Sequence, residues 1–438
     1  MKDVTKLDYK ECKYRVVECT LIFSDGSKHE FNPDYDVGEI ILEKNYDSYQ
    51  YPFMLITLNI SGELNKKMRY NNDNLKLRLS MRYAMFKKGA TSIDQQNIEE
   101  HPFINDTFYM YFDDSSAYPY DDLAKIIDAD SQFGSNNPDI TNMQTAAELK
   151  CILYKEDAIT NPKSLFSDVI TGVTVTDAIT YLLMNAGVNT KILMSPSTNG
   201  RRYGQFIIPP LRIDEGLERI ANDYALHDNG STLFFDYDRL YIIEKINRCT
   251  AWEPNEPKTV YVAFITSTYD NTHRVGAYID EEDNEIYLTG NGNNSATSSI
   301  HTDEVMGSGL QVINKKTGKV SYYAIDGDKI SVVPNNKRLM YNRTIVINTG
   351  DANTINALKE RLNEKTITWS VYLDSTMLSE LTPNKEYRFV FPDSSKDKYN
   401  GSYRLVDHAT LFQKTGGDAD PRWMTIKTVA TFCGKATS

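Results

Sequence analysis

One stretch of this chain reads Gln205-Phe206-Ile207-Ile208-Pro209-Pro210-Leu211-Arg212-Ile213-Asp214-Glu215-Gly216-Leu217. Its apolar run ends at Pro209 and Pro210, which have no backbone N–H to donate, so the chain is extended before the next element. A helix is predicted to begin near Asp214, because the apolar residues that follow recur at the spacing of one helical face. These residues are Leu217, Ile220, Ala221 and Tyr224. Asp214 and Glu215 lie in the first turn, where the helix dipole stabilises anions.

The sequence after this helix reads Asp228-Asn229-Gly230-Ser231-Thr232-Leu233-Phe234-Phe235-Asp236-Tyr237-Asp238-Arg239-Leu240-Tyr241-Ile242-Ile243. Residues 228–230 provide the turn that ends the helix. Residues 232–235 and 239–243 are predicted as the two strands of a hairpin, and Asp236 and Asp238 are expected at its solvated corner. Helix and hairpin form one local unit.

The composition is that of a globular protein with sizeable hydrophobic cores. The chain has 438 residues, 40% of them hydrophobic and 11% aromatic, which predicts two or three domains. Its net charge of −12 argues against a surface that binds nucleic-acid phosphates or anionic membranes. The sequence contains neither a signal-peptide pattern nor an apolar run of about 18 residues. We therefore expect a chain that is made in the cytoplasm and has no stable membrane association.

The Cys and His residues predict no metal site and no catalytic group. The five Cys have no C-x-x-C spacing, so reduced and mostly buried thiols are expected. They are Cys12, Cys19, Cys151, Cys249 and Cys433. The six His lack the spacing of zinc ligands, and His408, which follows a strand of alternating residues, is expected to be packed or at an interface. The other His are His29, His101, His227, His273 and His301.

The first section, residues 1–158, is predicted to be an antiparallel β-barrel or sandwich. In Leu75–Tyr83 apolar residues alternate with polar ones, which indicates a strand with one buried face and one wet, basic face. Further strands are predicted at residues 14–23, 28–31, 54–60, 107–112 and 149–154. Polar insertions are expected at residues 87–105 and 128–145, and the second is expected to be a mobile loop.

The middle section, residues 159–250, is predicted to be a small α+β domain. In addition to the helix and hairpin above, it contains a helix over residues 178–186. Thr176 or Asp177 is the expected N-cap, and Gly187 follows where a left-handed C-terminal cap is common. Residues 252–257, with two Pro, are expected to form a stiff polar connector.

The last section, residues 251–438, is predicted to be a second β-barrel domain. It contains one helix near residues 352–363 and an exposed loop over residues 289–303, which are rich in Gly, Asn, Ser and Thr. Its strands are predicted at residues 258–266, 366–373, 386–391, 401–406 and 424–432.

Three patterns that resemble functional motifs are better explained by turns and loops. Residues 280–285 are acidic but lack the Gly and the ligand spacing of an EF-hand, so a solvated hairpin tip is expected. Gly290-Asn291-Gly292 lacks the third Gly of a dinucleotide-binding loop and is expected to be flexible. Asp113 with Asp114, and Asp236 with Asp238, offer the carboxylate pairs of a glycosidase, but acids at turn corners are far commoner.

Two segments of the last section carry a family resemblance. They read Leu381-Thr382-Pro383-Asn384-Lys385-Glu386-Tyr387 and Gly401-Ser402-Tyr403-Arg404-Leu405-Val406-Asp407-His408. Together with residues 205–243 and the alternating terminal strand, they resemble baseplate hub proteins of tailed phages, a family that includes late control gene D and tail-associated hub proteins. The insertions at residues 128–145 and 289–303 depart from that family, and the end at Ser438 leads us to expect no fused lysozyme or peptidase.

The resemblance implies a mainly β fold, with two tube-like antiparallel β-barrel domains flanking a small α+β domain. It also implies a homotrimeric ring that connects a sixfold tail tube to a threefold central spike and continues the DNA channel. The expected partners are the tail tube protein, the spike and other baseplate proteins, with DNA present only in passage. The expected location is the virion tail baseplate. Such a protein is not an enzyme, and no catalytic residue, cofactor or metal is expected.

Two other functions stay open at this point. Tyr-rich loops suit a receptor-binding or adhesion module of the virion that contacts cell-wall sugars, because 29 Tyr provide many amphipathic rings. A carboxylate pair suits a cell-wall hydrolase. A hub lies on the particle axis and an adhesin at its periphery, whereas hydrolysis of purified peptidoglycan would identify the enzyme.

Overall fold

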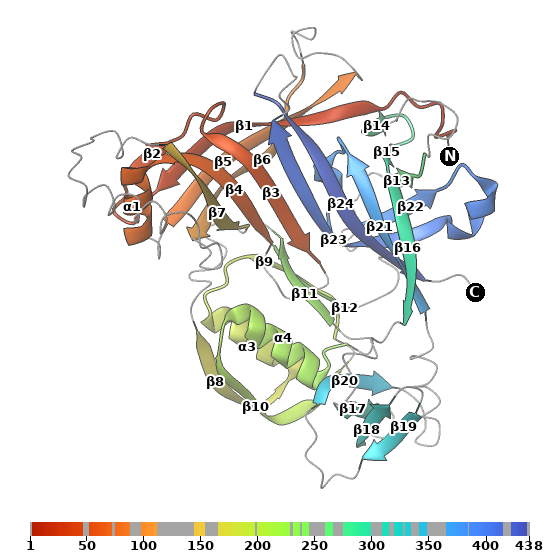
Figure 1. Cartoon of the computed structure of the whole chain (residues 1–438). Coiled ribbons are helices and arrows are strands. Elements are labelled where there is room, and N and C mark those ends of the chain that lie inside the picture. The colour runs from red at the N-terminus through yellow and green to blue at the C-terminus, as the bar shows by residue number, and fades with distance from the viewer. Residues whose placement is uncertain are drawn as a thin grey trace.

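The protein is mainly β, as predicted (Figure 1). A computed structural model describes residues 2–46, 52–71, 75–87, 98–111, 144–153, 165–197, 199–227, 231–236, 239–244, 259–265, 275–298, 309–314, 319–326, 329–333, 341–347, 365–383, 385–414 and 422–435. Within these ranges no helix is long and apolar enough to cross a membrane.

The N-terminal strands show the predicted alternation of buried and exposed residues. In β5 (Leu75–Lys87) the side chains of Leu77 and Leu79 are fully buried, whereas those of Lys76 and Arg78 are partly exposed. The predicted period of two is therefore confirmed. The other elements here are β1 (Lys10–Ile22), β2 (Lys28–Glu30), β3 (Val37–Asn45), β4 (Phe53–Ser61), α1 (Gly62–Tyr70), β6 (His101–Tyr111) and β7 (Gln144–Ile152). Since β6 begins at His101, residues 101–105 belong to a strand and the predicted polar insertion over residues 87–105 extends too far.

The C-terminal strands also occur where they were predicted, with small differences at their ends except in β23, which continues to Lys414 beyond the predicted end at residue 406. They are β13 (Thr259–Ala263), β21 (Lys365–Asp374), β22 (Glu386–Val390), β23 (Gly401–Lys414) and β24 (Met424–Lys435). This part of the chain also contains β14 (Ala277–Asp280), β15 (Glu285–Thr289), β16 (Asn291–Ser298) and the 3-10 helices η5 (Leu378–Glu380) and η6 (Ser394–Tyr399). The predicted helix near residues 352–363, the connector at residues 252–257 and most of the insertion at residues 128–145 lie outside the described residues.

The strands of the first and last sections form one continuous sheet. Hydrogen-bonded neighbours run in the order β14-β15-β13-β22-β23-β3-β4-β7-β6-β5-β1-β24-β21-β16, and β2 pairs with β1. Because β23 also pairs with β24, the eight strands β23-β3-β4-β7-β6-β5-β1-β24 form a closed circuit. A second circuit, β1-β14-β15-β13-β22-β23-β24, shares β1, β23 and β24 with the first. Strands of residues 1–158 and 251–438 are thus interleaved, and the division into two barrel domains stays a prediction.

One hydrophobic core fills both circuits, and it contains three of the Cys residues. Residues from β1, β4, β5, β21, β22, β23 and β24 belong to the same buried cluster. The free thiols of Cys12, Cys19 and Cys151 are buried, as predicted, and Cys433 is half-buried. Burial raises the pKa of Cys12 and Cys19 to about 12, because the thiolate is poorly solvated there. Cys249 lies outside the described residues.

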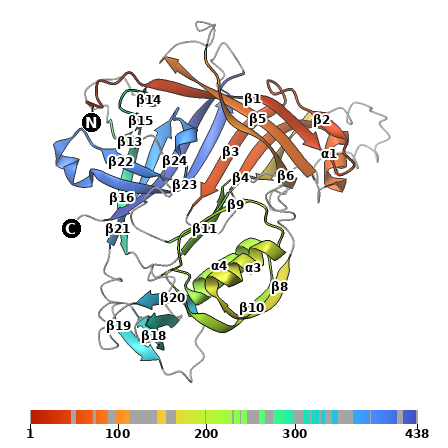
Figure 2. The ribbon, with the colours of Figure 1, turned by 180° about the vertical axis from the view of Figure 1, so that it is seen from behind.

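The middle section lies beside the large sheet and has a separate hydrophobic core (Figures 1 and 2). Its helices are α3 (Val175–Asn185) and α4 (Ile213–Tyr224), which pack against each other. Next to them are a two-stranded sheet of β8 (Phe166–Thr174) and β10 (Arg202–Leu211) and a three-stranded sheet of β9 (Lys191–Met194), β11 (Ser231–Asp236) and β12 (Arg239–Glu244). The predicted helix from residue 214 and the hairpin that follows it are confirmed, including the buried face of Leu217, Ile220 and Ala221.

The N-cap of α3 is Thr174, so the predicted caps Thr176 and Asp177 are wrong. The Thr174 hydroxyl accepts a hydrogen bond from the backbone N–H of Asp177, and the Asp177 carboxylate accepts one from the N–H of Thr174. This reciprocal pair is a capping box, which begins the helix one residue after Thr174. Gly187 has the predicted left-handed conformation, with φ 67°.

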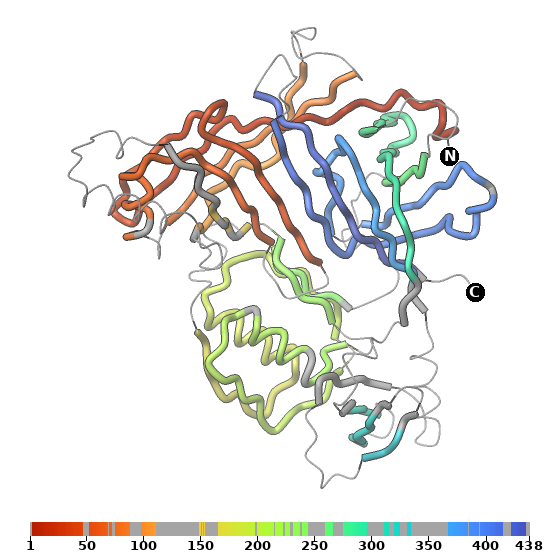
Figure 3. The backbone as a smooth tube through the Cα atoms, viewed as in Figure 1, coloured from red at the N-terminus to blue at the C-terminus, as the bar shows by residue number. Residues whose placement is uncertain are grey.

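A further four-stranded sheet, which the sequence analysis did not identify, follows β16 in the chain. It consists of β17 (Gly309–Asn314), β18 (Val320–Asp326), β19 (Lys329–Val333) and β20 (Tyr341–Ile347). Ile313 of this sheet packs against Ala225 after α4, so the sheet adjoins the middle section. Figure 3 shows it at the far end from the large sheet, while the two chain termini lie close to the large sheet.

The predicted exposed loop over residues 289–303 is wrong in its described part. Asn291–Ser298 form β16, which pairs with β21 over eight residues without a register shift. A Cβ at Gly292 would lie 2.2 Å from the carbonyl oxygen of Ser370, and one at Gly290 would lie 2.7 Å from Val371. Both Gly residues are therefore needed for close approach to the sheet, and the interpretation of residues 290–292 as a flexible loop is also wrong.

Candidate functional site

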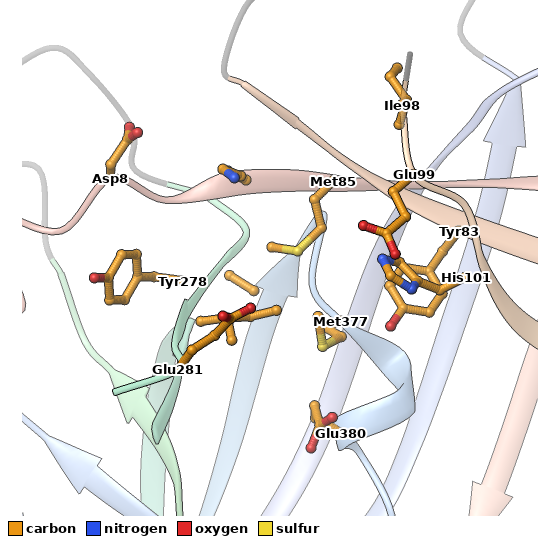
Figure 4. A pocket seen from close by; sticks show the side chains of 13 residues that line it. Asp8, Tyr83, Met85, Ile98, Glu99, His101, Tyr278, Glu281, Met377 and Glu380 are labelled. Carbon is orange, nitrogen blue, oxygen red and sulfur yellow. The ribbon is translucent and has the colours of Figure 1, made fainter. Parts of the chain in front are cut away.

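A pocket of about 790 Å³ lies where the start of β1 meets β14 (Figure 4). Its apolar floor, as we call these buried or half-buried lining residues, consists of Tyr83, Met85, Ala277, Ile279 and Met377. Its acidic groups are Asp8, Glu99, Glu281 and Glu380, of which the first three are exposed. This pocket has no signal in the sequence, because its lining comes from five segments that are far apart in the chain.

Close packing of β14 on β1 forms one wall of the pocket. Lys10 of β1 pairs with Ala277 of β14, and Gly276 immediately precedes that pair. Gly276 has φ +104°, and a Cβ there would lie 2.0 Å from the carbonyl oxygen of Lys10. Only Gly fits this position, because any side chain would separate the two strands.

The opposite wall is positioned by a buried tyrosine of β1. The Tyr14 hydroxyl donates a hydrogen bond to the carbonyl oxygen of Thr376 at 3.2 Å and accepts one from the N–H of Leu378 at 2.8 Å. Met377 lies between these two anchored residues and faces the pocket. Burial raises the pKa of Tyr14, so its hydroxyl remains a donor at any physiological pH.

An ion pair fixes the strand that carries the pocket's histidine. The Glu100 carboxylate lies 2.7 Å from Arg15 Nη2 and 3.7 Å from Arg82 Nη1, immediately before β6 begins. His101, the first residue of β6, then stacks on Tyr83, with 5.2 Å between the ring centroids and 34° between the ring planes. Glu99 is on the other side of Glu100 in the chain and lines the pocket beside His101 (Figure 4).

A second polar feature is a buried ion pair between the large sheet and the middle section. Lys44 Nζ of β3 lies 2.6 Å from Asp236 Oδ1 at the end of β11, and the two side chains are only 5% and 8% exposed. The prediction of a solvated hairpin corner at Asp236 is therefore wrong. The reason is tertiary, because Lys44 is 192 residues away in the chain and removes the carboxylate from water. Asp238, Asp113 and Asp114 lie outside the described residues.

His408 of β23 lies close to this ion pair and is packed, as predicted. Its side chain is 3% exposed, and its ring centroid lies 6.1 Å from that of Tyr46, which follows β3. Burial and, to a lesser extent, the nearby Lys44 ammonium together lower the pKa of His408 to about 3. His408 is therefore neutral at pH 7 and does not act as an acid.

The remaining described His residues occupy three different environments. His227 is fully buried between the hydroxyls of Ser195 and Ser231, at 2.9 and 2.8 Å, and so joins the ends of β9 and β11. His29 is exposed and contacts Phe31, and His101 lines the pocket. His273 and His301 lie outside the described residues. The described His residues are not brought together in one site.

The acidic segment at residues 280–285 is the tip of the β14–β15 hairpin, as predicted. Asp280, Asp283 and Glu285 approach one another within 4.8 Å, but Asp280 is buried and forms an ion pair with Lys2. That ammonium lowers the pKa of Asp280 and occupies the position that a cation would take. Glu285 accepts a hydrogen bond from the Tyr261 hydroxyl at 3.0 Å. These contacts give the acids a structural role.

Solved structures that match most of this chain at low identity include two that are described as tail proteins. The tail protein from Neisseria meningitidis MC58 is 11% identical, with a TM-score of 0.43 over 95% of this chain and 96% of that chain. The 43 kDa tail protein of prophage MuSo2 from Shewanella oneidensis is 9% identical, with a TM-score of 0.35 over 94% of this chain and 97% of that one. A Francisella PdpA–VgrG complex contains a chain that is 8% identical, with a TM-score of 0.44 over 97% of this chain and 53% of that one. A search of curated proteins found no match.

A family model gives the identification by sequence. The model for the Bacteriophage PBS1 gene 109 protein matches residues 10–428, which include parts of all three predicted sections. The predicted resemblance to a family of phage proteins is thereby confirmed. The chain belongs to the family of the bacteriophage PBS1 gene 109 protein.

Proposed function

We propose that this chain is the structural hub of a phage tail baseplate. One observation carries the proposal: the strands form two closed circuits that share β1, β23 and β24. If each circuit is one tube-like barrel, three copies place six barrels around one axis. Such a ring matches a sixfold tail tube on one side and a threefold central spike on the other.

The other parts of the proposal follow from that ring. The chain is made in the host cytoplasm and is incorporated into the tail baseplate, where it contacts the tail tube protein, the spike and other baseplate proteins. The middle section and the four-stranded sheet lie to one side of the large sheet and are available for these contacts (Figure 1). DNA passes through the ring without stable binding, and the net charge of −12 supports this role because acidic walls repel the phosphate backbone.

The experiment that tests the hub is a measurement of mass and shape. We expect light scattering to give about 150 kDa, three times 49.9 kDa, and electron micrographs to show a ring with a central opening. The measurement is made on the protein alone and with its candidate spike. A mass that stays near 49.9 kDa at high concentration with the spike present would contradict the proposal.

One observation weighs against the hydrolase alternative. Asp236 was one of the carboxylates considered for a glycosidase pair, and it is buried in an ion pair with Lys44. A glycosidase carboxylate has to reach the scissile bond of a bound sugar. We therefore expect no release of fragments from purified peptidoglycan by the protein.

A further inference from the structure

We propose that the pocket between β1 and β14 binds an arginine or lysine side chain from a basic segment of a partner protein. The proposal rests on the chemistry of the pocket lining and does not depend on the hub function. Three properties carry it: an excess of carboxylates, an apolar floor, and walls that are already held in place.

The charge of the pocket favours a cation. Asp8, Glu99, Glu281 and Glu380 line it, and Lys10 is the only Lys or Arg among its lining residues. Glu380 is partly neutralised by Lys385, whose Nζ lies 2.8 Å from it. Asp8, Glu99 and Glu281 have no ion-pair partner within the described part of the chain. A positive group that enters the pocket therefore meets carboxylates that are not yet paired.

The floor selects a long cation with an aliphatic stem over a bare metal ion. Tyr83, Met85 and Met377 present apolar surface to the pocket (Figure 4), and Ile279 also lines it. Lys and Arg side chains pack their methylene groups on such surface while the charged end remains near water and carboxylates. Tyr rings attract cations, and the flexible Met side chains adapt to the stem. A metal ion needs several converging oxygen ligands, and within the described residues such a convergence occurs at Asp280, Asp283 and Glu285 and not in this pocket.

The walls are held in place before any partner binds. Gly276 fixes β14 on β1, Tyr14 anchors both neighbours of Met377, and Arg15 fixes Glu100 beside Glu99. Binding therefore immobilises few groups of this protein, which reduces its entropic cost. A weak peptide probe can consequently give a measurable signal.

The test uses two short synthetic peptides that differ in charge alone. One alternates Gly and Arg, and the other has citrulline in place of each Arg, which preserves the shape and removes the charge. Binding is followed by the NMR signals of the Met85 and Met377 methyl groups, which lie in the pocket. We expect the arginine peptide to shift both signals at low salt and the citrulline peptide to shift neither.

Two variants locate the binding. The double variant Glu99→Gln, Glu281→Gln removes two exposed charges of the pocket. It should fold normally and bind the arginine peptide with about tenfold lower affinity. Glu30→Gln, an exposed substitution on β2, should leave affinity unchanged. Equal shifts with both peptides, no shift with either, or full affinity in the double variant would overturn the proposal. Spermidine is the last probe. If spermidine shifts the Met signals and the arginine peptide does not, the ligand of the pocket is a small polycation and not a protein segment.

Discussion

Replacing Asp236 by Asn is expected to destabilise the protein strongly, although the residue lies at the end of a hairpin strand. The substitution leaves the Lys44 ammonium, which is 5% exposed, without its carboxylate 2.6 Å away. Water screens such a pair little, and removing one partner of a buried pair costs about 3–5 kcal/mol. That loss is a large part of a typical unfolding free energy of roughly 5–15 kcal/mol. We expect urea unfolding to show this decrease.

A matched exposed pair and a double variant give the controls. Asp3→Asn breaks the pair between Lys6 and Asp3, whose side chains are 81% and 49% exposed, and should leave the urea midpoint almost unchanged because water screens an exposed pair. Lys44→Met combined with Asp236→Leu removes both charges and should recover most of the stability, because no ion is then left buried alone. The reasoning is refuted if Asp236→Asn unfolds at the same urea concentration as the wild type. It is also refuted if the double variant is as unstable as the single one.

Three further predictions concern two buried residues of the large sheet and one helix end. His408 has a pKa of about 3 in the fold and 6.5 when unfolded, so the unfolded state binds more protons between these values. Stability should therefore fall by about 1.4 kcal/mol per unit as pH decreases from 6.5, and His408→Leu should lose that part of the dependence in acid titrations. Leu77→Asp should prevent folding, because it places a charge at a fully buried position, whereas Lys76→Ser should melt like the wild type. Thr174→Ala should lower stability by about 1 kcal/mol in the same melts, since it removes the cap of α3.

The features that the sequence predicted are those whose signal is local. The alternation in Leu75–Tyr83 predicted β5, because successive side chains of a strand point to opposite faces and apolar residues therefore mark the buried face. The helix from residue 214 and the hairpin after it were predicted for the same reason, since their apolar spacing and turn residues lie within one short segment. The burial of three of the five Cys was likewise predicted without knowledge of their neighbours in space.

The features that the sequence did not predict depend on distant partners. Residues 291–298 contain hardly any apolar side chain, and they form a strand because β21 supplies their hydrogen bonds. Asp236 looked like a solvated turn residue because its partner Lys44 is on β3. The pocket between β1 and β14 forms only when the two strands pair at Lys10 and Ala277, which are far apart in the sequence. The residue pattern of a single segment does not show which distant segments it will contact.

The pairing of β1 with β24 has a consequence for folding during synthesis on the ribosome. Tyr14, near the beginning of the chain, is paired with Met424, near its end. At a synthesis rate of about 5–20 residues per second, the N-terminal strands wait roughly 20–80 s for the strand that completes their circuit. During that time the circuit stays open, and its exposed apolar surface and unpaired strand edges favour aggregation of the nascent chain. A chain that ends before β23 and β24 can close neither circuit, because both circuits contain these two strands.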